Sequence, residues 1–374
     1  MKHLVIGLDA KRIVRNGTGL GSYGRTLVND LAARADGDLL RLYAPDEGRD
    51  DLRRQVKITP DVRFCYPKGK LSALGKALWR SRGIVSDLVA DGVDVFHGLS
   101  GELPTGLRCA GIKSVVTIHD LIFLRHPEWY NWIDTKIYAW KFRQTLREAD
   151  RIIAISERTR QDIMELGGIG DDRIRLVYQS YAPRFAALPA GQALEAVRAR
   201  YQLPERFVLN VGTIERRKNV KLAVEALALL PQDIHLVVVG RQTPYVKELP
   251  ETPRVHLLSG VSDEELAAIY AMAEAFVYPS RYEGFGIPII EAIAAGLPVV
   301  ACTGSCLEEA GGPDSLYVDP DDVQGLAAAL SAVLRGTEGR EQRISRSQQY
   351  IARFRGTDVA GQVRAIYDEV LNTP

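Results

Sequence analysis

Cysteine is scarce in this sequence. The 374 residues include four, Cys65, Cys109, Cys302 and Cys306. No two of them form a C-x-x-C pair, and no group of Cys and His has the spacing of zinc ligands. Cys302 and Cys306 are close, in a stretch that also contains Gly and Ser, and we interpret them as reduced structural residues. This pattern argues against a zinc site.

Long apolar runs are also missing. No stretch approaches the ~18 consecutive apolar residues that a helix needs to cross a bilayer. The apolar run within residues 1–7 is too short for a signal peptide, and Asp9 follows it almost at once. The sequence therefore predicts a cytoplasmic protein, which can still touch the inner face of the membrane as a peripheral partner.

An excess of charge of one sign is the third feature that the sequence lacks. The formal net charge is +1, with 25% charged residues. Proteins that bind nucleic acid in general carry a strong basic excess, so we expect no nucleic-acid partner. A hydrophobic content of 46% is ordinary for a globular protein. Because one compact core rarely exceeds about 250–300 residues, this chain length predicts two domains.

Short β-branched runs alternate with longer amphipathic stretches along the chain. We expect strands at 4–8, 39–43, 62–66, 93–97, 114–118 and 151–155, and again at 207–211, 235–239, 255–258, 275–278 and 299–301. We expect helices at 22–35, 72–90, 132–148, 157–166, 220–230, 263–271, 289–295 and 323–334. Apolar strands joined by helical crossovers are typical of parallel sheets covered on both faces, which places the chain in the α/β class.

The best candidate for a linker is 178–191, which holds two prolines and lacks periodicity. It separates two Rossmann-like domains, predicted at 1–182 and 190–354. After about Gly336 the sequence reads as helix alone, at 338–354 and 358–371. We expect the last segment, 355–374, to pack back on the first domain.

The strongest chemical signal is the segment from Pro279 to Ala292, which follows a buried strand and leads into an apolar helix. Gly284 and Gly286 let a ligand approach the backbone closely. Amides at the helix start favour an anion, while Glu283 and Glu291 can each accept hydrogen bonds from hydroxyls. A nucleotide sugar offers both kinds of group. The alternative is that Glu283 caps the helix and Glu291 is a solvated surface acid.

A second signal, from Asn210 to Asn219, also joins a strand to a helix. Arg216, Arg217 and Lys218 concentrate positive charge at the helix entry, where cations cost stability unless an anion arrives. A diphosphate supplies that anion through charge-assisted hydrogen bonds. Lys218 is the first candidate ligand and Arg217 the second, with Arg216 facing water. The alternative is a solvated basic turn.

A Gly-rich segment, Gly17, Gly19 and Gly21, precedes the first predicted helix. In a dinucleotide fingerprint the glycines follow the first strand directly, whereas here Asp9 to Asn16 intervene. The segment fits a loop that closes over a phosphate about as well as it fits no function.

His119 lies at the end of a predicted buried strand, and ligands of parallel sheets usually bind at the carboxyl ends of the strands. His97 ends the preceding strand and could share the site. A strand-end histidine can also be a plain hydrogen-bonding residue.

Two pairs of aspartates have the D-x-D spacing of some metal sites, Asp36 with Asp38 and Asp319 with Asp321. The first pair reads as a turn and the second as part of a helix cap. We therefore expect no metal.

In this order, these segments resemble the retaining glycosyltransferases of family four. The resemblance covers nearly the whole chain and implies the GT-B fold, two Rossmann-like domains whose parallel sheets face across a cleft that holds the active site. The first domain would bind the acceptor and the second the nucleotide-sugar donor. The family also has an arginine at the position of Thr213, whose contact Arg216 or Arg217 could replace.

The resemblance also assigns roles to particular residues. It implies that Lys218, Glu283 and His119 serve catalysis. The donor diphosphate would be held by Lys218, Arg217, Gly19, Gly21 and the amides of Phe285 and Gly286. His119, Glu283, Gly284 and Phe285 would bind the donor sugar, and Glu291 the ribose.

The segment around Gly212 is similar to bacterial mannosyltransferases of polysaccharide assembly. This implies a hexose donor, with GDP-mannose as the first to test, no cofactor, no metal, and a glycan or lipid-linked acceptor. Aromatic and basic residues could form an amphipathic surface for such an acceptor, or simply a partly buried helix: Arg125, Trp129, Tyr130, Trp132, Lys136, Tyr138 and Lys141. The alternatives are a nicotinamide-dependent oxidoreductase, an epimerase or phosphorylase on the same scaffold, and a non-catalytic GT-B-like protein.

Overall fold

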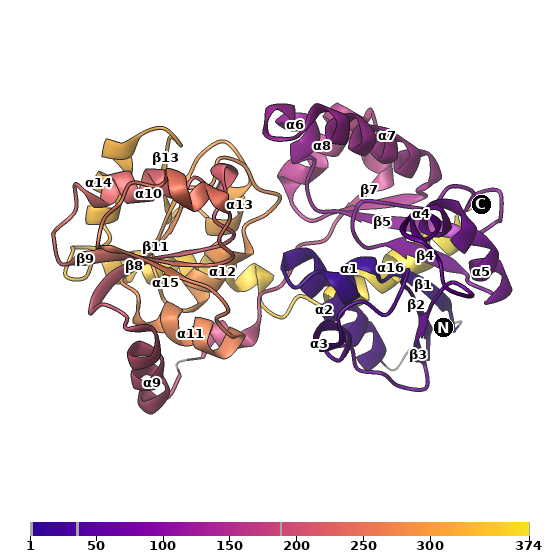
Figure 1. The fold of residues 1–374 in the computed structure, drawn as a ribbon, viewed down its shortest axis with the longest axis horizontal. Coiled ribbons are helices and arrows are strands. Elements are labelled where there is room, and N and C mark those ends of the chain that lie inside the picture. Colours follow the sequence, from indigo (N-terminus) through magenta and orange to yellow (C-terminus); the bar gives the residue numbers. More distant parts are fainter. Residues whose placement is uncertain (1–2, 35–36, 188, 374) are drawn as a thin grey trace. The chain divides into compact units, whose positions relative to one another are not determined.

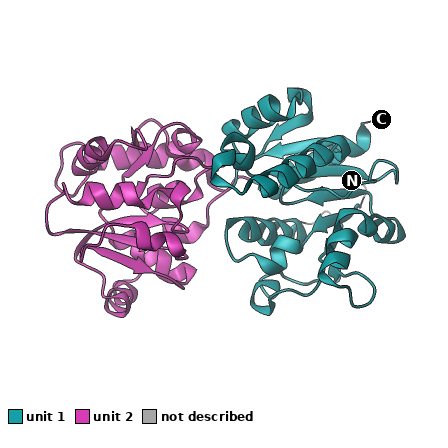
Figure 2. Cartoon of the chain, turned by 45° about the horizontal axis from the view of Figure 1, so that its top comes forward, with its two compact units in different colours: residues 1–179, 358–374 teal, residues 180–357 magenta. Residues whose placement is uncertain are grey.

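A computed structural model describes residues 3–34, 37–187 and 189–373. The chain forms two compact units, coloured separately in Figure 2. Unit 1 contains Met1–Gln179 and Asp358–Pro374, and unit 2 contains Ser180–Thr357. Unit 1 ends close to the predicted limit of 182 and unit 2 ends close to the predicted limit of 354, but unit 2 begins at Ser180 and not at the predicted 190.

The core element of unit 1 is a seven-stranded parallel sheet with the order β3-β2-β1-β4-β5-β6-β7 (Figure 1). Its strands are β1 (Val5–Asp9), β2 (Leu39–Tyr43), β3 (Val62–Cys65), β4 (Val95–Gly98), β5 (Lys113–Ile118), β6 (Arg151–Ala154) and β7 (Ile174–Leu176). The six predicted strands are confirmed within two residues at each end. The edge strand β7 was not predicted, because three residues carry no periodicity.

The helices of unit 1 cover both faces of this sheet. They are α1 (Lys11–Arg15), α2 (Gly19–Ala33), α3 (Asp50–Arg53), α4 (Ala73–Leu78), α5 (Ile84–Ala90), α6 (Ile122–Arg125), α7 (Trp132–Glu148), α8 (Glu157–Gly167) and α16 (Val359–Asn372). The helix predicted at 72–90 is interrupted by a π-helical turn, η1 (Trp79–Gly83). The helix predicted at 22–35 starts earlier, at Gly19, and its last predicted residue lies outside the described residues.

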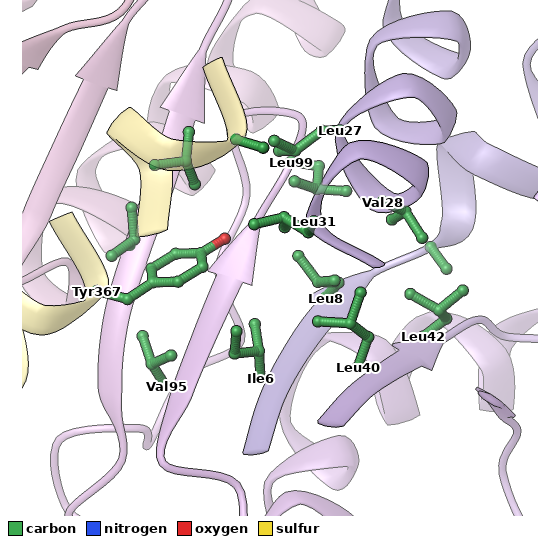
Figure 3. Close-up of a cluster of buried hydrophobic side chains, with 14 of the residues drawn as sticks. Ile6, Leu8, Leu27, Val28, Leu31, Leu40, Leu42, Val95, Leu99 and Tyr367 are labelled. Carbon is green, nitrogen blue, oxygen red and sulfur yellow. The ribbon is translucent and has the colours of Figure 1, made fainter. Parts of the chain in front are cut away.

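The two faces of the sheet carry separate apolar layers. On one face, α2 and α16 bury leucine, isoleucine and valine side chains of the first strands (Figure 3). On the other face, α5, α7 and α8 pack over Val116, Ile152 and their neighbours. The C-terminal helix α16, yellow in Figure 1, contacts α2 and β5 although more than 170 residues of unit 2 precede it in the chain.

Unit 2 has a six-stranded parallel sheet with the order β10-β9-β8-β11-β12-β13. Its strands are β8 (Arg206–Val211), β9 (Ile234–Val239), β10 (Val255–Leu258), β11 (Ala275–Tyr278), β12 (Val299–Cys302) and β13 (Leu316–Val318). Its helices are α9 (Gly191–Tyr201), α10 (Val220–Leu227), α11 (Asp263–Met272), α12 (Ile287–Ala294), α13 (Leu307–Gly311), α14 (Val323–Ser331) and α15 (Arg340–Ile351). The last strand, β13, and the helices α9 and α13 were not predicted.

Both sheets reverse their order beside their first strand. In unit 1 the reversal lies between β1 and β4, and in unit 2 between β8 and β11. Ligands of open α/β sheets bind outside the carboxyl ends of the strands at this point. The fold therefore points to the segments after β1, β4, β8 and β11.

The predicted linker 178–191 is more structured than expected. It contains a 3₁₀ turn, η4 (Pro183–Ala186), whose Phe185 is buried edge-on to Tyr270 at 5.4 Å between ring centroids. Part of this segment therefore belongs to the core of unit 2. The burial of Phe185 was not predicted, because this segment contains two prolines and lacks periodicity.

Candidate active site

The segments after β8 and β11 bring together the two strongest sequence signals. Lys218 ends the 3₁₀ turn η5 (Arg216–Lys218), and Glu283 lies between β11 and α12. The Lys218 ammonium lies 2.5 Å from the Glu283 carboxylate, and the Arg217 guanidinium lies 2.9 Å from its second oxygen. The interpretation of these residues as a helix cap and a solvated basic turn is therefore wrong.

The electrostatics of this cluster keep all three groups charged. Burial alone would raise the pKa of Glu283, but Lys218 and Arg217 outweigh it and lower this pKa to about 2. Burial disfavours the Lys218 ammonium, yet Glu283 raises its pKa above the ordinary value. Arg217 is also held by Glu215 at 2.9 Å and donates to the Tyr282 carbonyl at 2.6 Å. These bonds orient both cations before any ligand binds.

Tyr278, the last residue of β11, is a member of the cluster that the sequence analysis missed. Lys218 donates a hydrogen bond of 2.8 Å to its hydroxyl, and the ammonium lies 5.0 Å from its ring centroid. Burial raises the pKa of Tyr278 to about 12, so the hydroxyl stays protonated. Its place at a strand end beside the sheet reversal was the signal that could have found it.

Arg216 is excluded from this cluster. Its side chain is 76% exposed and pairs with Glu248 at 2.7 Å. The cation that joins Lys218 is therefore Arg217, as the order of candidates predicted.

Hydrogen bonds from Cys306 stabilise the glycine turn between Glu283 and α12. Its thiol donates to the carbonyls of Glu283, at 3.1 Å, and of Phe285, at 2.7 Å. Gly286, the N-cap of α12, has a φ of 131°, and a β-carbon there would lie 3.1 Å from Ala310. Only glycine takes this conformation without strain. The turn is a rigid frame for the amides at the start of α12.

Glu291 begins the second turn of α12 and is half-buried. Burial raises its pKa to about 8, and the Tyr270 hydroxyl donates to it at 3.3 Å. The alternative of a fully solvated surface acid is therefore wrong. A carboxyl group of this kind can both donate to and accept from a hydroxyl near neutral pH.

In unit 1, His119 directly follows β5, as predicted. Its Nε2 lies 2.9 Å from the Leu99 carbonyl and its Nδ1 lies 3.2 Å from the Gln179 amide. Burial lowers the pKa of His119 to about 4, so the ring is neutral. Because a carbonyl oxygen can only accept, Nε2 carries the proton and Nδ1 accepts from Gln179.

His97 is a structural residue and the expectation that it shares the site is wrong. It is fully buried, with Nδ1 at 2.7 Å from the Tyr367 hydroxyl and Nε2 at 2.8 Å from the Thr117 hydroxyl. Burial lowers its pKa to about 3. Both ring nitrogens are occupied, and the bond to Tyr367 ties α16 to the sheet.

Gly19 and Gly21 lie in the first turn of α2, so the predicted flexible loop is wrong at these two positions. A β-carbon on Gly21 would lie 1.8 Å from the Asn16 carbonyl oxygen. Gly21 is therefore required for the close approach of two backbone segments. Gly19 has open space around it.

A cavity of about 180 Å³ adjoins His119. Its polar lining includes Arg12, Glu102, Asp120 and Lys141, and aromatic rings of Phe123, Tyr130 and Tyr138 complete it. It belongs to unit 1 alone. The predicted aromatic and basic surface contributes three of its residues, Tyr130, Tyr138 and Lys141.

The aspartate pairs have structural roles. Asp38 pairs with Arg364 of α16, and Asp36 lies outside the described residues. Asp321 pairs with Arg281, and its amide donates to Asp319 at 2.9 Å. The cap of α14 is the next residue, Asp322, which accepts from the Gly325 amide. Among the described residues, no group of three or more His, Cys, Asp and Glu is arranged to hold a metal ion. Within the same residues, no helix is both long and apolar enough to cross a membrane.

Two family models match the chain. The model described as glycosyl transferases group 1 matches residues 195–350, and the model described as glycosyltransferase family 4 matches residues 17–181. Together they cover most of both units.

Two curated relatives resemble the chain over most of their length. The O-antigen chain mannosyltransferase B of Escherichia coli is 29% identical, over 90% of this chain and 92% of the relative. The MMP alpha-(1->4)-mannosyltransferase of Mycolicibacterium hassiacum is 27% identical, over 92% of this chain and 86% of the relative.

Solved structures share the fold. Sucrose-phosphate synthase of Thermosynechococcus elongatus superposes with a TM-score of 0.79 at 23% identity, over 98% of this chain and 99% of that one. An Anabaena protein in complex with UDP-glucose superposes with a TM-score of 0.74 at 18% identity, over 98% of this chain and all of that one.

Proposed function

The chain belongs to the glycosyltransferases of group 1 and family 4, with the GT-B fold, and from this premise we propose how it works. It transfers a hexose from a nucleoside-diphosphate sugar to an acceptor hydroxyl, with retention of the anomeric configuration. The alternative of a nicotinamide-dependent oxidoreductase is not favoured, because Gly19 and Gly21 lie in a helix and the relatives are glycosyltransferases.

The observation that carries this proposal is the contact between Lys218 and Glu283. In a nucleotide sugar, the sugar hydroxyls and the diphosphate flank the same anomeric carbon. A carboxylate that accepts from hydroxyls and an ammonium that binds phosphate must therefore lie side by side. Lys218 and Glu283 are 2.5 Å apart, and Arg217 lies at the same carboxylate.

The residues of unit 2 stabilise the leaving group. As the bond to the anomeric carbon breaks, negative charge grows on the diphosphate. Lys218, Arg217 and the amides of Phe285 and Gly286 supply fixed positive charge, which lowers the barrier because it needs no reorganisation. Glu283 and Gly284 hold the sugar, and Glu291 hydrogen-bonds the ribose.

His119 orients the sugar as a neutral hydrogen-bonding group. Its pKa of about 4 excludes a positively charged ring at neutral pH. The acceptor proton passes to the departing phosphate rather than to a protein base. Gly19, at the start of α2, adds a backbone amide for the diphosphate, whereas the Gly21 amide already donates to the Thr18 carbonyl at 3.0 Å.

The first donor to test is GDP-mannose, since two curated relatives are named mannosyltransferases. No metal is required, because the cations of the cluster neutralise the diphosphate. The acceptor is a glycan or a lipid-linked glycan. We further propose that the enzyme works in the cytoplasm and contacts the membrane surface through the exposed side chains of α7, which include Trp132, Ile133, Ile137 and Trp140.

Hydrolysis of a panel of nucleotide sugars by the whole chain tests the donor. We expect GDP-mannose to be turned over without added metal and in the presence of EDTA. Linkage analysis of a product then tests retention. Turnover of NAD with no turnover of any nucleotide sugar would overturn the proposal.

A further inference from the structure

The loop between β13 and α14, residues 319–322, contacts both segments that carry the donor cluster of unit 2, and none of the roles above uses it. Asp319 folds this loop. Its side chain accepts from the Asp321 amide at 2.9 Å, and its carbonyl accepts from the Asp322 amide at 3.0 Å. Pro320 lies between them and has a fixed φ. The loop is therefore a preorganised turn.

The first contact of the loop is with Asn219, the residue after Lys218. The Asn219 amide group donates to the Pro320 carbonyl at 2.8 Å, and the residue is only 6% exposed. Asparagine at a helix N-cap usually accepts from the amides of its own helix, but Asn219 makes no such bond with α10. Its side chain is directed at the loop instead.

The backbone of Asn219 is also unusual. Its φ is 54°, and among the described residues Gln202 is the only other non-glycine residue with a positive φ. Asparagine tolerates this conformation better than most residues do. Asn219 thus turns the chain from the η5 turn, which ends at Lys218, into α10, and the loop holds it in that conformation.

The second contact of the loop is with the segment after β11. Asp321 forms an ion pair with Arg281, which lowers the pKa of this carboxyl group, so it stays ionised. The Arg281 amide donates to the Arg217 carbonyl at 2.9 Å, and the Arg217 guanidinium donates to the Tyr282 carbonyl at 2.6 Å.

These contacts connect three segments in a closed ring. The loop reaches the segment 216–219 through Asn219 and the segment 281–283 through Arg281, and the Arg281 amide joins those two segments directly. Lys218 and Arg217 meet Glu283 through their side chains, so the positions of both cations depend on how firmly the two segments are held. Placement matters, because a shift of about 1 Å can cost about 10²-fold in rate.

We propose that the loop 319–322 positions the two cations of the donor site, with Asn219 and Asp321 as its positioning residues. Both act through the backbone of the segments that carry the cations rather than by contact with the donor. The D-x-D spacing of Asp319 and Asp321 is explained by the turn and its ion pair. The proposal rests on the proposed glycosyltransferase function, because it concerns the charges that stabilise the leaving group.

Asp321→Ala tests the proposal, and Asp322→Ala, at the neighbouring position, is its matched control. Asp321 is 73% exposed in its pair, so its loss should leave the melting temperature nearly unchanged, whereas Asp322→Ala removes the cap of α14 and should lower it. The kinetics should show the opposite pattern. We expect kcat for the donor to fall about fivefold in Asp321→Ala and to stay at the wild-type value in Asp322→Ala, with KM unchanged in both.

A purely structural role predicts that activity follows the melting temperature. Wild-type kcat in Asp321→Ala would overturn the proposal, as would an equal loss of kcat in Asp322→Ala.

Variants of Asn219 separate its hydrogen bond from its backbone conformation. Asn219→Gly keeps the positive φ but loses the bond to Pro320, and we expect kcat to fall about fivefold. Asn219→Ala loses both, and kcat should fall further. Either cut opens the ring, so Asn219→Gly combined with Asp321→Ala should lose less than the product of the two effects, about 25-fold. Wild-type kcat in Asn219→Gly, or a full product in the double variant, would contradict a ring that acts as one unit.

Hydrogen exchange of the intact chain tests the loop without a donor. Asp321→Ala should speed exchange at least about threefold in the segments 216–219 and 281–283, whereas Asp322→Ala should speed it in the first turn of α14. Faster exchange in these segments together with no turnover of any nucleotide sugar by the wild type refutes the proposed function and leaves the contacts of the loop standing. Unchanged exchange together with normal wild-type turnover refutes the role of the loop alone.

Discussion

The two units share a strand order but differ at the point where that order reverses. After β8 of unit 2, Lys218 and Arg217 converge on Glu283. After β1 of unit 1, the carboxylate Asp9 is instead neutralised by Arg80, which arrives from the π-turn. In unit 2 the segment after the first strand thus supplies two cations to the cluster, whereas in unit 1 the first strand ends at an ion pair that lines a cavity.

This difference shows that the sheet topology determines where a ligand site lies, whereas the loops determine which groups line it. In unit 2, Glu283 holds both Lys218 and Arg217, and Glu215 also holds Arg217, an arrangement that orients two cations for a diphosphate. In unit 1, Asp9 is already paired, and the neighbouring cavity is lined by both charged and apolar side chains.

The largest effect is expected from Lys218→Ala, which tests the role assigned to the cluster of unit 2. We expect kcat for the donor to fall by about 10²–10³-fold, because a fixed charge that stabilises the leaving group is lost. Lys221→Ala is the matched control, since Lys221 lies on α10 of the same unit and forms an exposed ion pair with Glu225. Steady-state kinetics of both variants measure the effect. Near-normal turnover by Lys218→Ala would remove the basis of the unit 2 assignment.

A second prediction concerns stability and unit 1. Arg80→Ala leaves Asp9 buried without its partner, which typically costs about 3–5 kcal/mol in the free energy of unfolding. The control is Arg54→Ala, whose exposed pair with Asp50 is expected to contribute under about 1 kcal/mol. Urea unfolding followed by circular dichroism measures both. If the two variants are equally stable, the wall of the cavity is not held by this ion pair.

The smallest expected effect is a pH dependence at Glu291. Its pKa is raised from 4.5 to about 8, so between these values the folded protein holds a proton that the unfolded chain releases. The stability contributed by this group is therefore present below about pH 4.5 and is lost as the pH rises towards 8. The melting temperature of Glu291→Gln minus that of the wild type should therefore be larger near pH 8 than near pH 4.5. If this difference in melting temperature is the same at both pH values, the assigned burial of Glu291 is contradicted.

Much of the fold could be predicted from the sequence because local patterns carry it. Buried parallel strands read as apolar β-branched runs, and the helices between them read as amphipathic stretches. Several of the elements that were missed are short, such as β7, β13 and α13, where three to five residues leave no period to detect. The eleven-residue helix α9 was missed as well. The π-turn at Trp79–Gly83 was missed because it interrupts an otherwise regular helical pattern.

The sequence by itself determined the fold class, the family and the acid and base pair Glu283 and Lys218, because residue type and spacing after a strand are local properties. Only the tertiary structure decided which groups meet. It selected Arg217 over Arg216, added Tyr278 to the cluster, made His97 a structural residue and placed Arg80 against Asp9. The physical reason is that charge pairing and burial depend on residues that are distant in the chain and become neighbours only when the sheets are formed.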